Sequence, residues 1–133
     1  MRYRTEQIRN VVMLGHGGDG KTTLTESLLF NTGAIDRFGR VEDGNTTTDF
    51  DPEEIKRHIS ISAAIAPVEY NGYKINIIDC PGYFDFYGEV ESAANIADGA
   101  LILLSAVSGM VVGTEKAMDL TRRKNIPRIL FVN

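Results

Sequence analysis

The segment that most restricts how this chain can fold is the glycine-rich run 15–22, Gly-His-Gly-Gly-Asp-Gly-Lys-Thr. It matches the pattern Gly-x-x-x-x-Gly-Lys-[Ser/Thr], which binds nucleotide phosphates when it joins a strand to a helix. An apolar run, 8–14, precedes the segment, and residues that favour helix, 21–30, follow it. An ordinary glycine-rich turn is the alternative, and this context disfavours it. The segment therefore predicts a P-loop within an α/β domain.

Each residue type in the P-loop 15–22 has a chemical reason to be there. Glycines let the backbone curl so that several N–H groups point at one anion, and the helix N-terminus adds partial positive charge. Lys21 is expected to reach the β- and γ-phosphates, the Thr22 hydroxyl to ligate Mg²⁺, and Thr23 to donate to the α-phosphate. The predicted nucleotide-binding residues of this segment are Gly15, His16, Gly17, Gly18, Asp19, Gly20, Lys21, Thr22 and Thr23.

A second motif, Asp-x-x-Gly, opens the region 79–88. Asp79 ends an apolar strand and can present its carboxylate to Mg²⁺, through a water molecule. Gly82 lets a backbone N–H approach the γ-phosphate. Alone the motif is weak, and a plain turn at the end of a strand is its alternative. Following a P-loop, it favours a GTPase over a generic ATPase.

Residues 33–58 are rich in Gly, Asp, Thr and charged side chains and show little periodicity. A connection this long inside a small domain is usually functional, so we expect a mobile loop, 33–60, over the nucleotide. The loop ends at Ser60, whose hydroxyl would complete the Mg²⁺ shell and lose that contact when the γ-phosphate leaves. A surface serine at the start of a strand is the alternative.

The remaining elements alternate between strand and helix patterns, which predicts a P-loop NTPase fold with a mostly parallel sheet, one antiparallel edge strand and flanking helices. Asn71-Gly72 predicts a hairpin that makes this edge antiparallel. Thr114 is expected to cap a helix. The expected elements are strands 59–68, 73–78, 100–105 and 129–132 and helices 89–97 and 114–124.

Composition excludes several classes of function. The net charge of −4 argues against non-specific binding to nucleic acid, and we expect no direct contact with it. The basic clusters 56–58 and 122–124 are interpreted as solvated faces. The single cysteine, Cys80, excludes an internal disulfide and fits a reducing compartment. No apolar stretch is long enough to span a bilayer or to serve as a signal peptide, so the expected location is cytoplasmic.

Six motifs occur in a fixed order: Gly-His-x-x-x-Gly-Lys-Thr-Thr-Leu-Thr-Glu at 15–26, Asn-Thr-Gly at 31–33, Thr-Thr-Thr-Asp at 46–49, Ile-Ser-Ile-Ser-Ala-Ala at 59–64, Asp-Cys-Pro-Gly-Tyr-x-Asp-Phe at 79–86 and Ile-Pro-Arg at 126–128. Together they resemble the N-terminal G domain of translation elongation factor G. The segment 44–51 looks most like the elongation factor G-like paralogues. The resemblance covers almost the whole chain, 1–133.

The resemblance implies a domain that binds GTP or GDP with Mg²⁺, docks on the ribosome, and hydrolyses GTP to drive translocation or a related remodelling step. It also implies that the chain is part of a longer protein and that its G domain is C-terminally incomplete. The chain ends on Asn133, which corresponds to the Asn of the guanine-reading motif Asn-Lys-x-Asp. The residues implied in catalysis are Lys21, Gly82 and Tyr83.

Several positions depart from the family pattern. Tyr83 stands where the family has the His that orients the attacking water, and a phenol cannot replace a histidine in that role near neutral pH. Gly17 and Gly18 replace an apolar residue and an Asp, and Asp19 is shifted by one position. Ser60 replaces a Thr but keeps the hydroxyl. The other three positions of note are Cys80, read as a small filler, His16, read as structural, and His58, with no role assigned.

Other functions share parts of this pattern. Ribosomal protection proteins and class II release-factor GTPases have the same motifs. A GTP-regulated switch that binds a partner and hydrolyses poorly is favoured by Tyr83, Gly17 and Gly18. A P-loop ATPase or kinase is disfavoured by the Asp-Cys-Pro-Gly sequence and by Asn133.

Overall fold

Strands and helices alternate along the chain of the computed structural model, which describes residues 3–133. The strands are β1 Ile8–Leu14, β2 Ala64–Tyr70, β3 Tyr73–Asp79, β4 Gly99–Leu104 and β5 Arg128–Val132. They form one sheet in the order β2-β3-β1-β4-β5. The pairs of β1 with β3, β1 with β4, and β4 with β5 are parallel, and β2 pairs antiparallel with β3. The predicted mostly parallel sheet with one antiparallel edge is confirmed.

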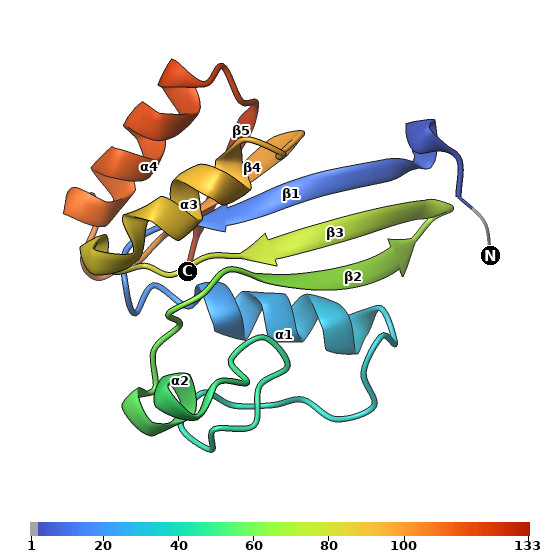
Figure 1. Cartoon of the computed structure of the whole chain (residues 1–133), viewed down its shortest axis with the longest axis horizontal. Helices are drawn as coiled ribbons and strands as arrows, with labels where there is room; N and C mark the ends of the chain where they lie inside the picture. Colours follow the sequence, from blue (N-terminus) through green and yellow to red (C-terminus); the bar gives the residue numbers. More distant parts are fainter. Residues whose placement is uncertain (1–2) are drawn as a thin grey trace.

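Helices cover both faces of this sheet (Figure 1). They are α1 Lys21–Asn31, α2 Pro52–Arg57, α3 Tyr87–Ala94 and α4 Val112–Arg123, with short 3-10 turns η1 Thr5–Gln7 and η2 Phe84–Phe86. Helix α1 lies under one face, and α3 and α4 lie over the other. No helix in residues 3–133 has the length and apolar composition needed to cross a membrane.

The alternation of side chains along β1 builds a separate core on each face. Val12 and Leu14 point to the face of α3 and α4, where they pack with Ile102 and Leu120. Met13 points to the opposite face and packs in the cluster that receives Leu29 of α1. Successive residues of a strand face opposite sides, so an uninterrupted apolar run is what a strand covered on both faces requires.

The expected strand 59–68 is wrong at its start, because β2 begins at Ala64. The backbone N–H groups of Ile61 and Ser62 donate to the Glu54 carboxylate, at 2.9 and 3.0 Å, and not to a neighbouring strand. Residues 59–63 therefore continue the preceding loop.

That loop contains a helix, α2, which the prediction of an irregular segment missed. Asp51 is its N-cap and accepts from the Glu53 N–H at 2.8 Å, and Glu54 reaches back to the Asp51 N–H at 3.1 Å. Pro52 occupies the first helical position, where a missing N–H has no consequence. The sequence Asp-Pro-Glu-Glu carried this signal as a capping box.

The boundaries of helices α3 and α4 also differ from the expected 89–97 and 114–124. Thr114 does not cap α4, because the helix begins at Val112 and Thr114 lies buried in its first turn. The earlier start brings Gly113 against the P-loop, where a Cβ would lie 2.6 Å from His16 Cα. Helix α3 ends at Ala94, and not at residue 97, because the N–H groups of Ile96 and Ala97 bond three residues back.

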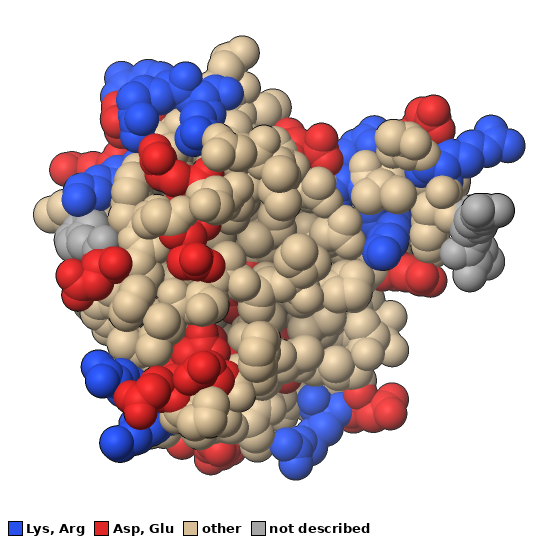
Figure 2. All heavy atoms as spheres, viewed as in Figure 1, with Lys and Arg blue, Asp and Glu red and all other residues tan. Residues whose placement is uncertain are grey.

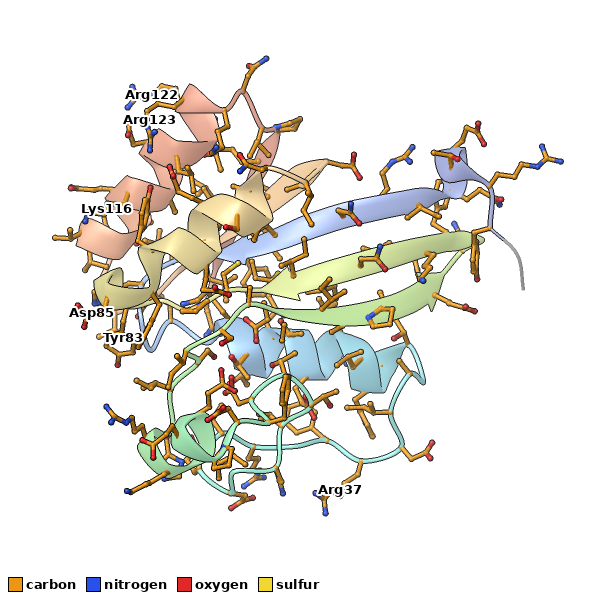
Figure 3. All side chains as sticks on the ribbon, in the orientation of Figure 1. Arg37, Tyr83, Asp85, Lys116, Arg122 and Arg123 are labelled. Carbon is orange, nitrogen blue, oxygen red and sulfur yellow. The ribbon has the colours of Figure 1, made fainter. Side chains whose placement is uncertain are left out.

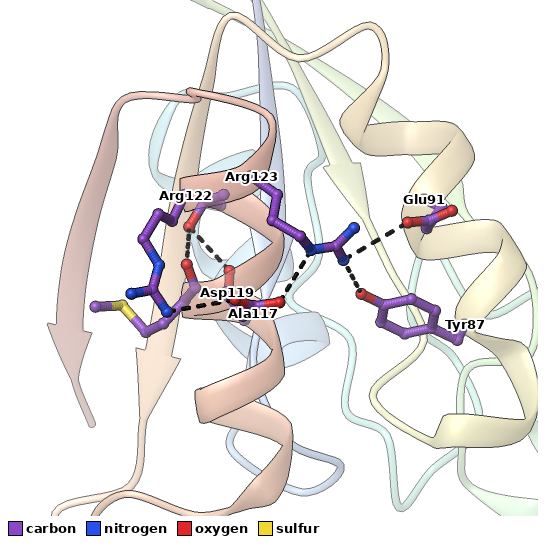
Figure 4. Close-up of polar contacts among 8 residues, drawn as sticks. Tyr87, Glu91, Ala117, Asp119, Arg122 and Arg123 are labelled. Atoms are coloured by element: carbon purple, nitrogen blue, oxygen red, sulfur yellow. Dashed lines mark hydrogen bonds and ion pairs between the residues drawn. The ribbon is translucent and has the colours of Figure 1, made fainter.

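Charged side chains of both signs are spread over the face in Figure 2, with Lys and Arg gathered at the end of α4. Arg122 and Arg123 belong to this group, and their side chains are more than half exposed. Figure 4 shows Arg123 joined to Asp119 at 2.9 Å and directed toward Tyr87 and Glu91 of α3. Exposed pairs of this kind contribute little to stability, as expected for a solvated face.

Candidate functional site

The site lies at the carboxyl edge of β1 and β3, where the P-loop joins β1 to α1. Gly18 and Gly20 have φ of 89° and 92°, which is backbone geometry that side chains disfavour. Gly20 is also the N-cap of α1. The curl therefore aims the first N–H groups of α1, and the positive end of its dipole, into one concave space.

Lys21, the first residue of α1, lies buried in the middle of this curl. Its Nζ donates to the carbonyls of Gly15 at 3.2 Å and His16 at 2.8 Å. Burial lowers the pKa of the Lys21 ammonium, and the carboxylates of Asp79 and Asp19 act against that shift. The structure thus holds a desolvated cation under the loop, where it can face an anion.

A cluster of hydroxyls and carboxylates from three segments lies beside Lys21. The hydroxyls of Thr22 and Thr48 both donate to Asp79 Oδ2, each at 2.8 Å. The Ser60 hydroxyl donates to Asp49 Oδ1 at 2.6 Å and lies 3.1 Å from the Thr22 hydroxyl. The structure therefore brings together all the predicted metal ligands, Thr22, Ser60 and Asp79. Thr48 and Asp49 were not predicted for this cluster.

Asp79 is the centre of that cluster and is 1% exposed. Burial raises the pKa of its carboxyl to about 6, although the bonds from Thr48 and Thr22 act in the opposite direction. Its Oδ1 has no hydrogen-bond partner among the described residues. An orphaned buried carboxylate oxygen next to several hydroxyl oxygens is a donor set that fits Mg²⁺.

Two buried glutamates anchor the loop 33–60, and sequence reasoning missed both. Glu26 of α1 accepts from the Gly39 N–H at 3.1 Å and from the N–H and hydroxyl of Thr47, at 2.9 and 3.1 Å. Glu54 of α2 holds the following segment by its bonds to Ile61 and Ser62. Each is at most 2% exposed. The capping box was the only signal for Glu54, and the signals for Glu26 were its place in a helix and its position at the end of the motif 15–26.

The Asp-x-x-Gly turn lies directly on the P-loop. A Cβ at Gly82 would lie 2.5 Å from Lys21 Nζ and 2.6 Å from the Gly17 nitrogen, so only glycine allows this approach. Tyr83 follows, and its ring lies over Gly17. Burial raises the pKa of the neighbouring Cys80 thiol to about 12, which keeps the thiol protonated and fits a filler role.

His16, Asp19 and Asn133 shape the loop. The Asp19 carboxylate accepts from the His16 N–H at 3.2 Å. The His16 side chain packs against Gly113 of α4, which agrees with a structural role. Asn133 Nδ2 donates to the Asp19 carbonyl at 3.0 Å, so the structure places Asn133 against the P-loop. Its part in reading guanine stays a prediction.

These elements enclose a cavity of about 210 Å³. Its lining comes from the P-loop, from the loop 33–60 and from the turn at 82–83, and includes His58, for which sequence reasoning found no role. His58 has a positive φ of 53° and lies 2.9 Å from the Val41 carbonyl through Nδ1. A second cavity, of about 400 Å³ and lined almost entirely by apolar side chains such as Val11 and Ile77, lies on the α1 face of the sheet, away from these groups.

Fold and site together define a P-loop nucleotide-binding domain, in which the buried Lys21 ammonium and a cluster of hydroxyl and carboxylate oxygens lie beside one cavity. Residues 6–133 match the family Elongation factor Tu GTP binding domain, and the chain belongs to this family of translation GTPase G domains. The resemblance to elongation factor G is confirmed by the relatives that follow.

Elongation factor G 2 of Streptomyces coelicolor is 44% identical over 126 residues, which are 95% of this chain and 18% of that protein. The tetracycline resistance protein TetP of Clostridium perfringens is 44% identical over 128 residues, covering 96% of this chain and 20% of that protein. A crystal structure of a Thermus thermophilus protein superposes with a TM-score of 0.92 at 46% identity, covering 95% of this chain and 19% of that one. This chain thus spans about a fifth of the length of each.

Proposed function

We propose that this chain binds GTP and GDP with Mg²⁺ and hydrolyses GTP, as the G domain of an elongation factor G-like protein that acts on the ribosome. The observation that carries the proposal is that Lys21, Thr22 and Ser60 line one cavity, from the P-loop and the loop 33–60. Asp79, at the end of β3, lies directly behind them and accepts from the Thr22 hydroxyl. A phosphate chain and a divalent cation are the two ligands that this set of charges and oxygens matches.

In this proposal the P-loop N–H groups and Lys21 bind the β- and γ-phosphates. The Lys21 ammonium already lies under the loop, so little reorganisation is needed when charge develops on the phosphate oxygens. Thr22 and Ser60 would hold Mg²⁺ directly, and Asp79 through water. The cation supplies charge neutralisation to the phosphates. Gly82 brings a backbone N–H to the γ-phosphate end of the cavity.

Ser60 makes the site responsive to the state of the nucleotide. Thr22 and Asp79 lie on a helix and a strand end, whereas Ser60 belongs to a loop fixed elsewhere by Glu26 and Glu54. Loss of the γ-phosphate would release Ser60 and let the segment between those anchors relax. The proposed mobility of the loop 33–60 is therefore confined by two buried carboxylates.

A GTP-regulated switch with weak hydrolysis is the second candidate. It is favoured by Tyr83, which stands where the family has a histidine capable of orienting water. The ring of Tyr83 lies beside Gly17. Relatives with this domain include both elongation factors and a tetracycline resistance protein, so a translocase and a ribosomal protection protein are both compatible with this chain.

The test uses the intact protein and labelled GDP. We expect tight binding that requires Mg²⁺, displacement by GTP but not by ATP, and GTP hydrolysis that ribosomes stimulate. Binding with no hydrolysis, either alone or on ribosomes, would favour the switch. Displacement by ATP as readily as by GTP would contradict a guanine-nucleotide site.

A further inference from the structure

Gly17 is a glycine for a reason different from that of its neighbours in the P-loop. Its φ lies outside the left-handed region that Gly18 and Gly20 occupy, so its backbone would accept a side chain. The space above Gly17 has no room for a side chain, because a Cβ at this position would lie 2.8 Å from Cζ and 2.9 Å from Cε2 of Tyr83. A side chain at 17 and the ring of Tyr83 therefore exclude each other.

Tyr83 occupies a boundary between two cavities. Its side chain lines the nucleotide cavity of about 210 Å³ and also a smaller one, of about 30 Å³, whose other walls include Tyr87, Val90 and Ala117 of α3 and α4. Tyr83 is 45% exposed and follows Gly82, which lies against Lys21. Figure 3 shows Tyr83 at the end of the molecule where these segments meet.

We propose that Gly17 and Tyr83 form a steric pair. The Tyr83 ring packs on the backbone of Gly17, which has no side chain, and forms a wall of the nucleotide site beside Lys21. The proposal rests on the proposed GTPase function and deepens it. Tyr83 acts through its ring as a positioning residue, which restricts the water that can reach the γ-phosphate end. It transfers no proton in this role, so hydrolysis does not depend on its hydroxyl.

The pairing explains two departures from the family at once. A histidine at 83 alone would leave the space above Gly17 unfilled, and a side chain at 17 alone would push the half-exposed ring into solvent. The two positions must therefore change together. Tyr83→His by itself is not expected to produce a more active enzyme.

The first measurement detects the packing of the Tyr83 ring on Gly17 in the absence of nucleotide. The intact protein is labelled with 3-fluorotyrosine, and the ¹⁹F resonance of Tyr83 is assigned by its loss in Tyr83→Phe. Gly17→Ala should shift that resonance toward the position of solvent-exposed fluorotyrosine. The matched control is Gly88→Ala in α3, where a Cβ meets nothing within 4 Å and the resonance should stay in place.

The second measurement is GTP hydrolysis by Gly17→Ala, by Tyr83→Ala and by the double variant. Each single change should lower kcat about tenfold, with the KM for GTP altered by less than about threefold, because the wall affects positioning more than binding. The double variant should also lose about tenfold and not about a hundredfold, since both changes remove one contact. Tyr83→Phe, which keeps the ring, should recover most of what Tyr83→Ala loses, with the same pH profile.

Three results would contradict the proposed pair. The first is an unshifted resonance in Gly17→Ala, and the second is a loss of kcat in the double variant that equals the product of the two single losses. The third is an equal loss of kcat in Tyr83→Phe and Tyr83→Ala. The last would assign the role to the hydroxyl. A wild-type protein that does not hydrolyse GTP would refute the proposed function, and the resonance would still decide whether the pair exists.

Discussion

At the scale of single residues, the site depends on charges kept away from water. Lys21 and Asp79 are both buried, and their environments move the two pKa values toward each other, downward for the ammonium and upward for the carboxyl. Each charge is therefore held at a cost that a bound ion of opposite sign would offset. The phosphate chain and Mg²⁺ would supply those ions.

Replacing Lys21 with alanine should abolish nucleotide binding, weakening it by on the order of a hundredfold or more, because a desolvated cation at the phosphates is lost. Equilibrium titration with labelled GDP measures this. Arg122→Ala, which removes an exposed cation from α4, is the control and should bind normally. Unchanged affinity in Lys21→Ala would contradict the P-loop proposal.

Asp79 gives a dependence on pH whose sign can be worked out. Its carboxyl pKa is about 6 in the fold against 3.8 when unperturbed, so the folded state binds the proton more tightly. The contribution of Asp79 to the free energy of unfolding is then fully present below pH 3.8 and is lost as the pH rises through about 6. This contribution is at most about 3 kcal/mol. Asp49, raised in pKa by its burial, acts in the same direction.

Without Mg²⁺, the protein should unfold at a higher temperature at about pH 5.5 than at about pH 7.5, on either side of the folded-state pKa of Asp79. Saturating Mg²⁺ at the higher pH should remove most of that difference, because the cation pairs with the ionised Asp79. Asp79→Asn should flatten the dependence on pH in the absence of the cation. Thermal unfolding in a pH series decides this, and a wild-type protein that is more stable at the higher pH would contradict the buried-carboxylate account.

At the scale of elements, the helices and strands around the P-loop follow from local sequence, and the segment between α1 and β2 does not. The apolar run of β1 and the Gly-Lys-Thr start of α1 each specify their own geometry, so their positions could be predicted. The bonds from Glu26 to Gly39 and Thr47 join residues far apart in the sequence, and nothing in a local pattern pairs them. Thr48 and Asp49 were missed for the same reason.

Glu26→Ala should loosen this segment without destroying the domain. It removes the acceptor for the buried Gly39 N–H and the partly buried Thr47 N–H, and leaving the buried one unpaired costs about 1–3 kcal/mol before the loop moves out into water. We expect faster proteolysis and hydrogen exchange in residues 36–50. Glu53→Ala, which removes an exposed partner of Arg57, is the control. Equal protection in both variants would show that Glu26 is not an anchor.

At the scale of the whole molecule, one sheet edge collects ligands from segments that are distant in the chain. The order β2-β3-β1-β4-β5 places β1 and β3 side by side, so Thr22 and Asp79 meet although 57 positions separate them. That neighbourhood was predictable from the P-loop and the Asp-x-x-Gly motif together. The seat of Tyr83 on Gly17 was not, because it depends on side-chain volume in three dimensions.

Since the ligands come from three segments, a nucleotide should stabilise the fold as a unit. GDP with Mg²⁺ at about 100 times its Kd should add about 2.7 kcal/mol to the free energy of unfolding. Chelation of the cation should reduce that gain, and ATP should give none. Differential scanning fluorimetry with each nucleotide makes the comparison. An equal gain from ATP would argue for a site that does not distinguish the bases.

In the proposed site, the rigid helix α1 would bind the phosphates at its N-terminus, and it holds the loop 33–60 through Glu26. Its N-terminus at Gly20 faces the proposed phosphate site, and Glu26, six positions further along, holds Gly39 and Thr47. At about 1.5 Å per residue, that spacing is about 9 Å, and it is fixed by helix geometry. One residue inserted between Thr22 and Glu26 would turn the glutamate by about 100°. The loop would then lose its register with the phosphates, although every residue of the motif was still present.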